Sequence, residues 1–211
     1  MAVEFPDTFR AEFHRLCQWR RDVRRFRPDP LPPGTLARLI EGAGTAPSVG
    51  LSEPWRFAIV DSVGARAALV ANFEAANAQA LAGYEGARQT LYAGLKLAGL
   101  REAPGVFAAF CDETDAKGHG LGHQTMPEMR RYSVVCAVMQ MWLAARAEGI
   151  GMGWVSILDP ARAARDMGVP AGWTLVALMC VGYPQAEHDE PELERAGWEP
   201  REGTAARVIT V

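Results

Sequence analysis

The sequence predicts an α+β fold, with a central mixed or antiparallel sheet of four to five strands and helices on both of its faces. Three observations lead to this prediction. The 211 residues are 49% hydrophobic and 22% charged, which is enough apolar material for one sizeable core. Residues 174–182 (TLVALMCVG) form a near-continuous apolar run, as in a central strand covered on both faces. Residues 128–148 predict a helix that is apolar on nearly every side, as in a core or a subunit interface.

The first third of the chain predicts two helices and one strand. A helix over 5–20 places aromatic and aliphatic residues along one face, and the proline-containing segment after it prevents continuation. A second helix is expected over 35–43. Residues 46–55 contain two prolines and predict a loop, and residues 56–61 (RFAIVD) are rich in branched and aromatic side chains, which favours a strand.

The rest of the chain alternates between helices and strands, with a polar, glycine-rich loop over 112–124. The expected helices are 64–82, 86–99, 128–148 and 160–167, and the expected strands are 104–111, 151–158 and 174–182. Neither an internal repeat nor a linker is visible, so residues 1–211 are interpreted as a single domain. Residues 184–211 form a polar C-terminal tail whose last six residues (ARVITV) are able to add an edge strand.

Composition excludes several classes of function. The net charge of −3 argues against general nucleic-acid binding, and no apolar run is long enough to span a bilayer. The first residues lack the apolar core of a secretory signal. The cysteines are scattered and His119 and His123 lack a third ligand nearby, so neither a disulfide framework nor a metal site is predicted. A cytoplasmic protein without a metal, membrane or nucleic-acid partner is therefore expected.

Positive charge is concentrated between Trp19 and Pro30 (WRRDVRRFRPDP). Five arginines fall within eight residues, with Asp22 among them. The guanidinium group offers a rigid fork of donors that matches phosphate oxygens. Taken alone, the stretch indicates either a solvated charged patch or an anion site.

Two further segments favour a ligand site. Residues 46–55 (APSVGLSEPW) predict a rigid polar loop, and residues 151–156 (GMGWVS) predict a strand whose glycines let a flat ligand approach the backbone. The glycines over 149–153 are not a dinucleotide fingerprint. That motif requires a strand, then glycines, then a helix, whereas here the order is helix, glycines, strand.

Together these three segments resemble the flavin-dependent nitroreductase superfamily. In that superfamily an Arg-Arg-Ser-x-Arg segment follows the first helix, and an Ala-Pro-Ser loop ends in Gln-Pro-Trp one helix later. The resemblance covers nearly the whole chain. It implies a nitroreductase-like fold, a homodimer built on the helix over 128–148, and FMN at the dimer interface.

The resemblance is closer to one branch, the BluB-type 5,6-dimethylbenzimidazole synthases. In that branch an aspartate replaces the serine, as in Arg20-Arg-Asp-Val-Arg24. The branch also has Ala-Pro-Ser-Val-Gly, Lys-Leu-x-Gly, Trp-Leu-Ala-Ala-Arg-Ala-Glu-Gly and Gly-Trp-Val-Ser, found here at 46–50, 96–99, 142–149 and 153–156. One departure is Glu53, where the superfamily has Gln before Pro-Trp.

The branch implies oxygen-dependent fragmentation of reduced FMN to 5,6-dimethylbenzimidazole, the lower ligand of vitamin B12, and erythrose 4-phosphate. Reduced FMN is then a substrate supplied by a separate flavin reductase, molecular oxygen is the co-substrate, and no metal is needed. The alternative is an NAD(P)H-dependent nitroreductase or quinone reductase that retains its flavin. A flavin-binding module without catalysis is a third interpretation.

The resemblance also implies roles for individual residues. Asp22 and Ser156 are the expected catalytic residues, Asp22 beside the ribityl chain and Ser156 beside the flavin ring. The alternatives are purely structural roles: Asp22 would form a salt bridge that keeps the arginines apart, and Ser156 would pack within its strand. Helices within 64–99 are expected to form a lid. The expected flavin-binding residues are Arg20, Arg21, Asp22, Val23, Arg24, Ser48, Gly50, Leu95, Ser156 and Arg201.

Overall fold

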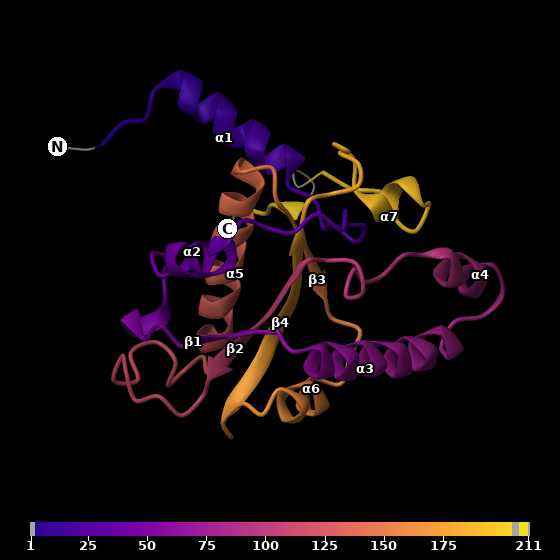
Figure 1. Ribbon diagram of the computed structural model, residues 1–211. Helices are drawn as coiled ribbons and strands as arrows, with labels where there is room; N and C mark the ends of the chain where they lie inside the picture. Colours follow the sequence, from indigo (N-terminus) through magenta and orange to yellow (C-terminus); the bar gives the residue numbers. More distant parts are fainter. Residues whose placement is uncertain (1–2, 204–206, 211) are drawn as a thin grey trace.

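A computed structural model describes residues 3–203 and 207–210 of the chain. Helices and strands alternate along the chain in an order close to the one predicted from the sequence (Figure 1). In chain order the elements are α1 (Asp7–Trp19), α2 (Thr35–Ala43), η1 (Val49–Leu51), β1 (Trp55–Ile59), α3 (Val63–Ala82), α4 (Gly86–Gly94), β2 (Gly105–Asp112), α5 (Met129–Ala147), β3 (Gly151–Val155), α6 (Pro160–Asp166), β4 (Trp173–Gly182) and α7 (Glu192–Arg195).

The described strands form one sheet in the order β1-β2-β4-β3, and every neighbouring pair is antiparallel. This agrees with the predicted sheet of four to five strands. Strands β2 and β4 are central, as the apolar run over 174–182 predicted. Strand β2 is buried along its whole length, and β4 is buried from Ala177 to Gly182. Strand β3 is an edge strand, so one side of its backbone is free to bind another segment.

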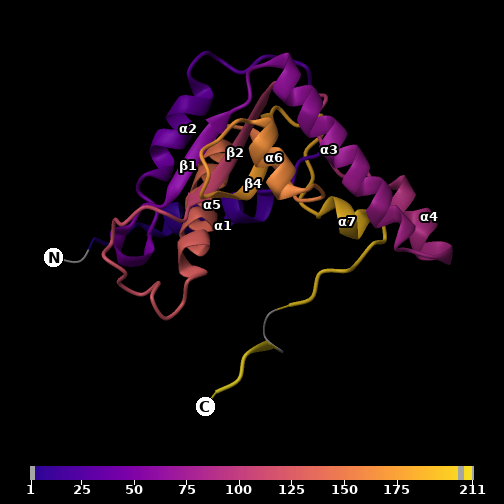
Figure 2. The same cartoon turned by 90° about the horizontal axis from the view of Figure 1, so that it is seen from below.

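Helices cover both faces of the sheet, as predicted (Figures 1 and 2). Helices α2 and α5 pack on one face, where Leu39, Val138 and Met141 join the core. Helices α3 and α6 pack on the other, through Leu69 and Ala163. Burying each large aliphatic side chain contributes roughly 1.5–3 kcal/mol to folding, so these two layers hold the sheet in place.

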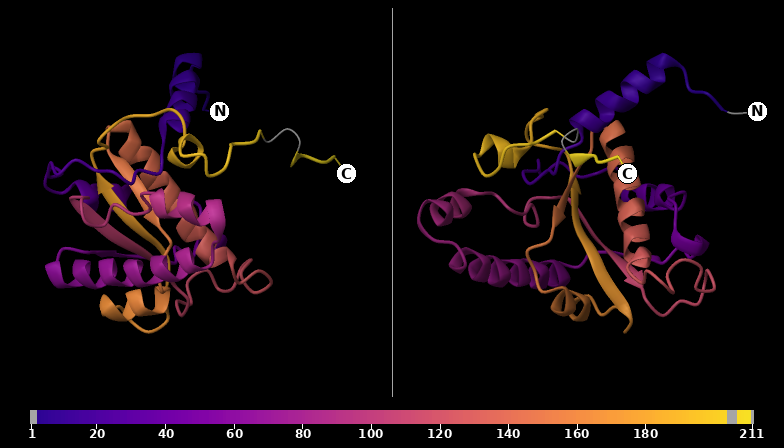
Figure 3. Two further views of the ribbon diagram at one scale, coloured as in Figure 1. Left: turned by 90° about the vertical axis from the view of Figure 1, so that its right-hand side faces the viewer. Right: turned by 180° about the vertical axis from the view of Figure 1, so that it is seen from behind.

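Helix α5 is apolar even on a side that the chain does not cover. Its Val134, Val138 and Met141 are buried against the sheet, but Val135 and Met139 are 37% and 41% exposed. Phe5, which precedes helix α1, stacks on Phe9, and Phe9 stacks on Phe13, with all three rings exposed. Helix α1 has no buried residue. It projects away from the body of the molecule (Figure 3). Both helices therefore present apolar surface outward.

The predicted helix over 86–99 is wrong beyond Gly94. Helix α4 ends there, and Leu95 already has an extended backbone with φ −76° and ψ 135°. The reason is tertiary packing. Gly99 lies so close to Phe26 that a Cβ atom at position 99 would be 2.4 Å from its ring. The chain leaves the helix in order to pack against the segment that follows α1.

The C-terminal tail after α7 runs over the surface, and residues 207–210 form no strand. Ala206 and Val211 of the proposed edge strand lie outside the described residues. Arg207 to Thr210 are exposed, including Val208 and Ile209 at 73% and 84%. Within residues 3–203 and 207–210, no helix combines the length and apolarity needed to cross a membrane.

Candidate functional site

The arginine-rich segment crosses the free edge of β3. The Val23 amide donates to the Met152 carbonyl at 2.9 Å, and Asp22 forms a parallel bridge with Met152. The glycines of β3 make this approach possible. A Cβ atom on Gly153 would lie 1.9 Å from the Val23 carbonyl oxygen, and one on Gly151 would lie 2.7 Å from a Val23 methyl group. The prediction that these glycines admit a flat ligand is wrong, because they admit residues 22–23 of the chain itself.

Replacing Gly153 by Ala is therefore expected to push the arginine-rich segment off β3. The clash is with backbone, which cannot rotate away, so we expect a loss of about 1–3 kcal/mol in the free energy of unfolding. Thermal denaturation measures the loss. Gly64→Ala is the matched control, since a Cβ atom there meets nothing within 4 Å. Equal stability of the two variants would contradict this account of β3.

The carboxylate of Asp22 is held by three donors. Its Oδ1 accepts from the Trp154 amide at 2.8 Å. Its Oδ2 accepts from Nε and Nη2 of Arg24, each at 2.9 Å. An ionised carboxylate offers about four acceptor positions, so roughly one remains. The side chain is 32% exposed, which leaves that position open to a ligand.

Side chains of the arginine-rich segment alternate between two sides, as expected for an extended backbone. Asp22 and Arg24 face the chain that follows α4, where Arg24 Nη1 donates to the Lys96 carbonyl at 3.4 Å. Leu95, a predicted flavin-binding residue, is the neighbour of Lys96. Arg25 faces the C-terminal tail and pairs with Glu192 at 3.4 Å. The segment is thus fixed between the chain after α4 and the tail.

Arg20, Arg21 and Arg201 gather positive charge in one place. Burial lowers the pKa of Arg20, an effect that Asp22 opposes and Arg201 reinforces. Burial also lowers the pKa of Arg21, with Arg20 and Arg201 adding to it. Within the described residues, the buried Nε of Arg21 has no hydrogen-bond partner. Clustered, partly desolvated guanidinium groups with an unused donor fit a phosphate group.

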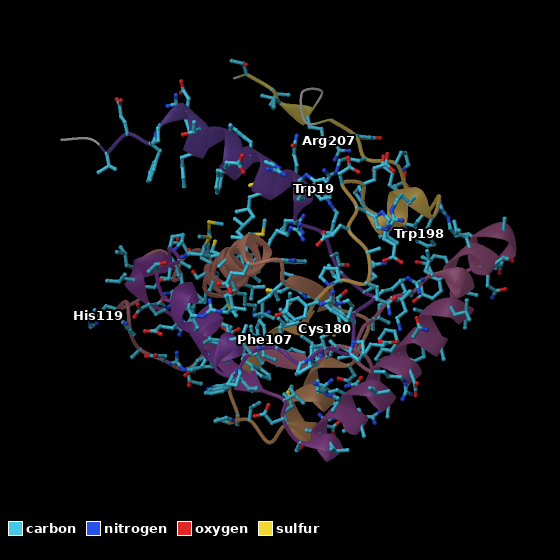
Figure 4. The ribbon with its side chains drawn as sticks, turned by 45° about the horizontal axis from the view of Figure 1, so that its top comes forward. Trp19, Phe107, His119, Cys180, Trp198 and Arg207 are labelled. Atoms are coloured by element: carbon cyan, nitrogen blue, oxygen red, sulfur yellow. The ribbon has the colours of Figure 1, made fainter. Side chains whose placement is uncertain are left out.

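A pocket of about 360 Å³ adjoins this cluster. It lies between the arginine-rich segment, the C-terminal end of α5, the start of β3 and the tail. The Arg20 guanidinium stacks over the Trp142 ring at 4.8 Å, and Trp142 Nε1 donates to the Arg21 carbonyl at 3.2 Å. Trp19, at the end of α1 where the segment begins, also lines the pocket (Figure 4).

Ser156 lies immediately after β3 and is exposed. It comes two residues after Trp154, whose amide binds Asp22. At about 3.3 Å per residue in a strand, the two backbone positions are roughly 7 Å apart. The Met152 carbonyl and the Trp154 amide both face residues 22–23 at the free edge of β3. Ser156 follows the end of this strand, two residues beyond the Trp154 amide that binds Asp22.

Ser48 and Gly50 lie at the other end of α5. The Val49 amide donates to Ser133 Oγ at 3.0 Å, near the start of that helix. Ser48 Oγ accepts from the Glu53 amide at 3.1 Å. Gly50 has φ 57°, and a Cβ atom there would lie 2.9 Å from the Leu121 carbonyl oxygen. Within one chain, the structure does not bring these two residues to the arginine-rich segment.

Comparison with known proteins identifies the family. A model described as the nitroreductase family matches residues 17–183. The chain belongs to the nitroreductase family. It is 54% identical over 197 residues to 5,6-dimethylbenzimidazole synthase of Rhodospirillum rubrum, covering 93% of each chain. It is 44% identical to an enzyme of that name in Rhodobacter capsulatus, covering 93% of this chain and 95% of the other.

Solved structures agree on the fold of this nitroreductase family member. Oxidized iodotyrosine deiodinase bound to FMN and 3-iodo-L-tyrosine superimposes with a TM-score of 0.74 at 23% identity. That match covers 94% of this chain and all of the other.

Several residues around the pocket were not predicted from the sequence. Trp142 and Arg146 end the apolar helix α5, and both line the pocket. Arg146 Nη1 donates to both carboxylate oxygens of Glu187, at 2.7 and 2.8 Å. The sequence feature that could have indicated these two pocket residues is a tryptophan and an arginine near the end of an otherwise apolar helix. No cluster of metal-ligating side chains is found in the part of the chain that the structure describes.

Proposed function

We propose that this nitroreductase family member is a 5,6-dimethylbenzimidazole synthase, which fragments reduced FMN with molecular oxygen. The products are 5,6-dimethylbenzimidazole, the lower ligand of vitamin B12, and erythrose 4-phosphate. The observation that carries the proposal is the identity of 54% and 44% to two synthases over nearly the full chain. Asp22 within Arg-Arg-Asp-Val-Arg supports it, because the wider superfamily has serine at this position.

The second candidate is a nitroreductase or quinone reductase that keeps its FMN, since many relatives of this fold are of that kind. The two functions differ in the fate of the flavin. Purified protein is mixed with NADPH, FMN and a nitroaromatic compound or a quinone. A synthase should leave the acceptor unreduced, whereas steady NADPH oxidation with FMN still bound would support the reductase.

The glycine sequence at 149–153 follows a helix and closes it, so it is no dinucleotide-binding turn. Because a synthase of this kind consumes reduced FMN as its substrate, we assign the supply of reduced FMN to a separate reductase.

The residues around the arginine-rich segment fit the phosphate and ribityl groups. We assign the phosphate to Arg20, Arg21 and Arg201, because the charges of Arg20 and Arg201 act on Arg21 and the buried Nε of Arg21 has no partner within the described residues. Arg24 and Val23 hold the next part of the flavin chain, with Leu95 beside them. The flavin itself supplies the oxygen chemistry when bound. The protein binds it, orients it and moves protons.

Asp22 is assigned the role of proton acceptor. Arg24 and the Trp154 amide hold its carboxylate in place, and about one acceptor position stays open toward a ribityl hydroxyl. Ser156, just beyond the end of β3, is assigned to orient the flavin ring or oxygen by hydrogen bonding. The fixed spacing of the two side chains along β3 sets the position of the ligand between them.

Helices α3 and α4 are assigned to a lid that excludes water from the site. They lie side by side, with the Tyr92 hydroxyl donating to Asn77 Oδ1 at 2.8 Å, and they extend along one edge of the molecule (Figure 2). Arg24 already contacts the chain that returns from α4. Because α3 packs on the sheet through Leu69, the part of the pair suited to open and close is its outer end, where α4 lies.

We further propose a homodimer in which α5 pairs with α5 of a second copy. Ser133, beside the Ser48 loop, and Trp142, beside Arg20, are nine residues apart, about 13.5 Å along the helix. Exposed Val135 and Met139 lie between them. If two α5 helices cross antiparallel at this point, the Ser48 loop of one copy meets the arginine-rich segment of the other. The dimer would thus complete a site that one chain leaves divided.

Met139→Glu is expected to convert the dimer to a monomer, because two carboxylates would be buried at the crossing point. FMN binding should be lost with it. Size-exclusion chromatography with light scattering and a flavin titration measure both properties. Val63→Glu is the control, since Val63 is 86% exposed at the start of α3. A dimeric Met139→Glu protein would contradict this interface.

We place the reaction in the cytoplasm. The four cysteines, Cys17, Cys111, Cys136 and Cys180, are all free thiols in the structure. Burial raises the pKa of Cys111 to about 11 and that of Cys180 to about 12, so these two remain protonated and unreactive. Free thiols of this kind suit a reducing compartment.

A further inference from the structure

The C-terminal tail is attached to the tip of the α3–α4 pair by an aromatic cluster made of Tyr84, Tyr92, Arg88 and Trp198. The rings of Tyr84 and Tyr92 stack at 4.9 Å, and the Trp198 ring packs edge-on against them at 5.5 and 6.0 Å. Figure 4 shows Trp198 between α7 and the α4 end of the pair. Trp198 lies more than 100 residues after the other three side chains, so the cluster is a tertiary contact and not a local turn.

Arg88 holds Trp198 in two ways. Its guanidinium lies over the indole ring, 4.7 Å from the centroid, and its Nη1 donates to the Trp198 carbonyl at 2.7 Å. A cation–π contact contributes about 0.5–1 kcal/mol at an exposed site, and the hydrogen bond fixes the backbone as well as the ring. Tyr92 is buried, which anchors the other side of the cluster in the helical pair.

Two hydrogen bonds also hold this part of the tail against helix α7. The Trp198 amide donates to the Leu193 carbonyl at 2.9 Å, and the Arg201 amide donates to Glu194 Oε1 at 3.2 Å. Only Glu199 and Pro200 separate Trp198 from Arg201, and proline restricts the backbone between them. The position of Arg201 therefore follows the position of Trp198.

The tail lies against the arginine-rich segment at Glu192, which pairs with Arg25 at 3.4 Å, and the charge of Arg201 is near enough to act on Arg20 and Arg21. We propose that Trp198, held by Arg88 and the two tyrosines, is a positioning residue that keeps Arg201 beside the flavin phosphate. This rests on the proposed function, in which Arg201 binds that phosphate. The α3–α4 pair and the phosphate site are then linked through one residue of the tail.

The test compares FMN with riboflavin, which lacks the phosphate. Oxidised flavins are titrated against the full-length protein by fluorescence, so the result does not depend on turnover. Trp198→Ala is expected to weaken FMN binding about tenfold, the effect of one misplaced charge-assisted hydrogen bond, and to leave riboflavin binding unchanged. Trp198→Phe should recover most of the affinity for FMN. Val63→Ala, on the same helical pair but outside the cluster, is the control and should match the wild type.

A double-mutant cycle with Arg201→Ala decides whether Trp198 acts through Arg201. If it does, Trp198→Ala combined with Arg201→Ala binds FMN no more weakly than Arg201→Ala alone. Equal losses for FMN and riboflavin, or additive losses in the double variant, would overturn the proposal. Failure of the wild type to form 5,6-dimethylbenzimidazole is a separate outcome, which would refute the proposed function and leave the binding comparison readable.

Discussion

Replacing Asp22 by Asn is expected to lower the yield of 5,6-dimethylbenzimidazole by about 10²–10⁴-fold, the usual contribution of a positioned proton acceptor. The amide oxygen can still accept from the Trp154 amide, so the segment stays on β3. The amide nitrogen then faces the donors of Arg24 and cannot take up a proton. Product is measured by chromatography after mixing reduced FMN with air, and FMN affinity is measured in parallel.

The structure offers a close control for this experiment. Asp29 lies in the same segment, pairs with Arg27 at 3.1 Å and is 53% exposed. Asp29→Asn should leave both product yield and FMN affinity near wild-type values, since an exposed ion pair contributes at most about 1 kcal/mol. If Asp22→Asn loses FMN affinity and product in equal measure, Asp22 belongs to the binding clamp and not to catalysis.

Ser156→Gly should behave like Asp22→Asn, with product lost and FMN still bound.

Removing Arg24 is expected to have the largest effect on binding. Its side chain is 14% exposed and joins the Asp22 carboxylate to the Lys96 carbonyl. Arg24→Ala therefore removes the ion pair with Asp22 and also the contact with the chain that returns from the lid. Hydrogen bonds to charged groups contribute about 1.5–3 kcal/mol each, which predicts a Kd for FMN raised by about 10–100-fold. Isothermal titration with oxidised FMN measures the change.

Arg27→Ala is the matched substitution within the same segment. Arg27 stacks on Tyr183 at 5.0 Å and pairs with Asp29, away from Asp22. It should bind FMN as the wild type does. Equal weakening in both variants would mean that the whole arginine-rich segment acts through its charge and not through the geometry of Arg24.

Much of the fold followed from local patterns. The apolar run over 174–182 predicted a central strand because both of its faces are covered, and β4 is such a strand. Helix α5 was predicted to lie in a core or a subunit interface because it is apolar all round. Val134, Val138 and Met141 are buried against the sheet, whereas Val135 and Met139 are exposed in the single chain. The chain over 95–99 could not be predicted, since its departure from a helix is imposed by Phe26, more than 70 residues earlier.

The site was predicted as a set of segments but not as an arrangement. The sequence of Arg20 to Arg24 indicates an anion site, yet it does not show that Asp22 binds the Trp154 amide or that Arg25 pairs with Glu192 of the tail. The glycines of β3 suggested room for a ligand, whereas they admit Val23. Such contacts depend on which strand lies at the edge of the sheet, and single-sequence patterns do not specify this.

The fate of the flavin tests the central proposal most directly. Chemically reduced FMN is mixed with the purified protein in air, without NADPH, and both FMN and 5,6-dimethylbenzimidazole are quantified over time. A synthase should form 5,6-dimethylbenzimidazole in proportion to the FMN that disappears, with erythrose 4-phosphate alongside. Complete recovery of oxidised FMN with no benzimidazole would contradict the proposal and leave a reductase that retains its flavin.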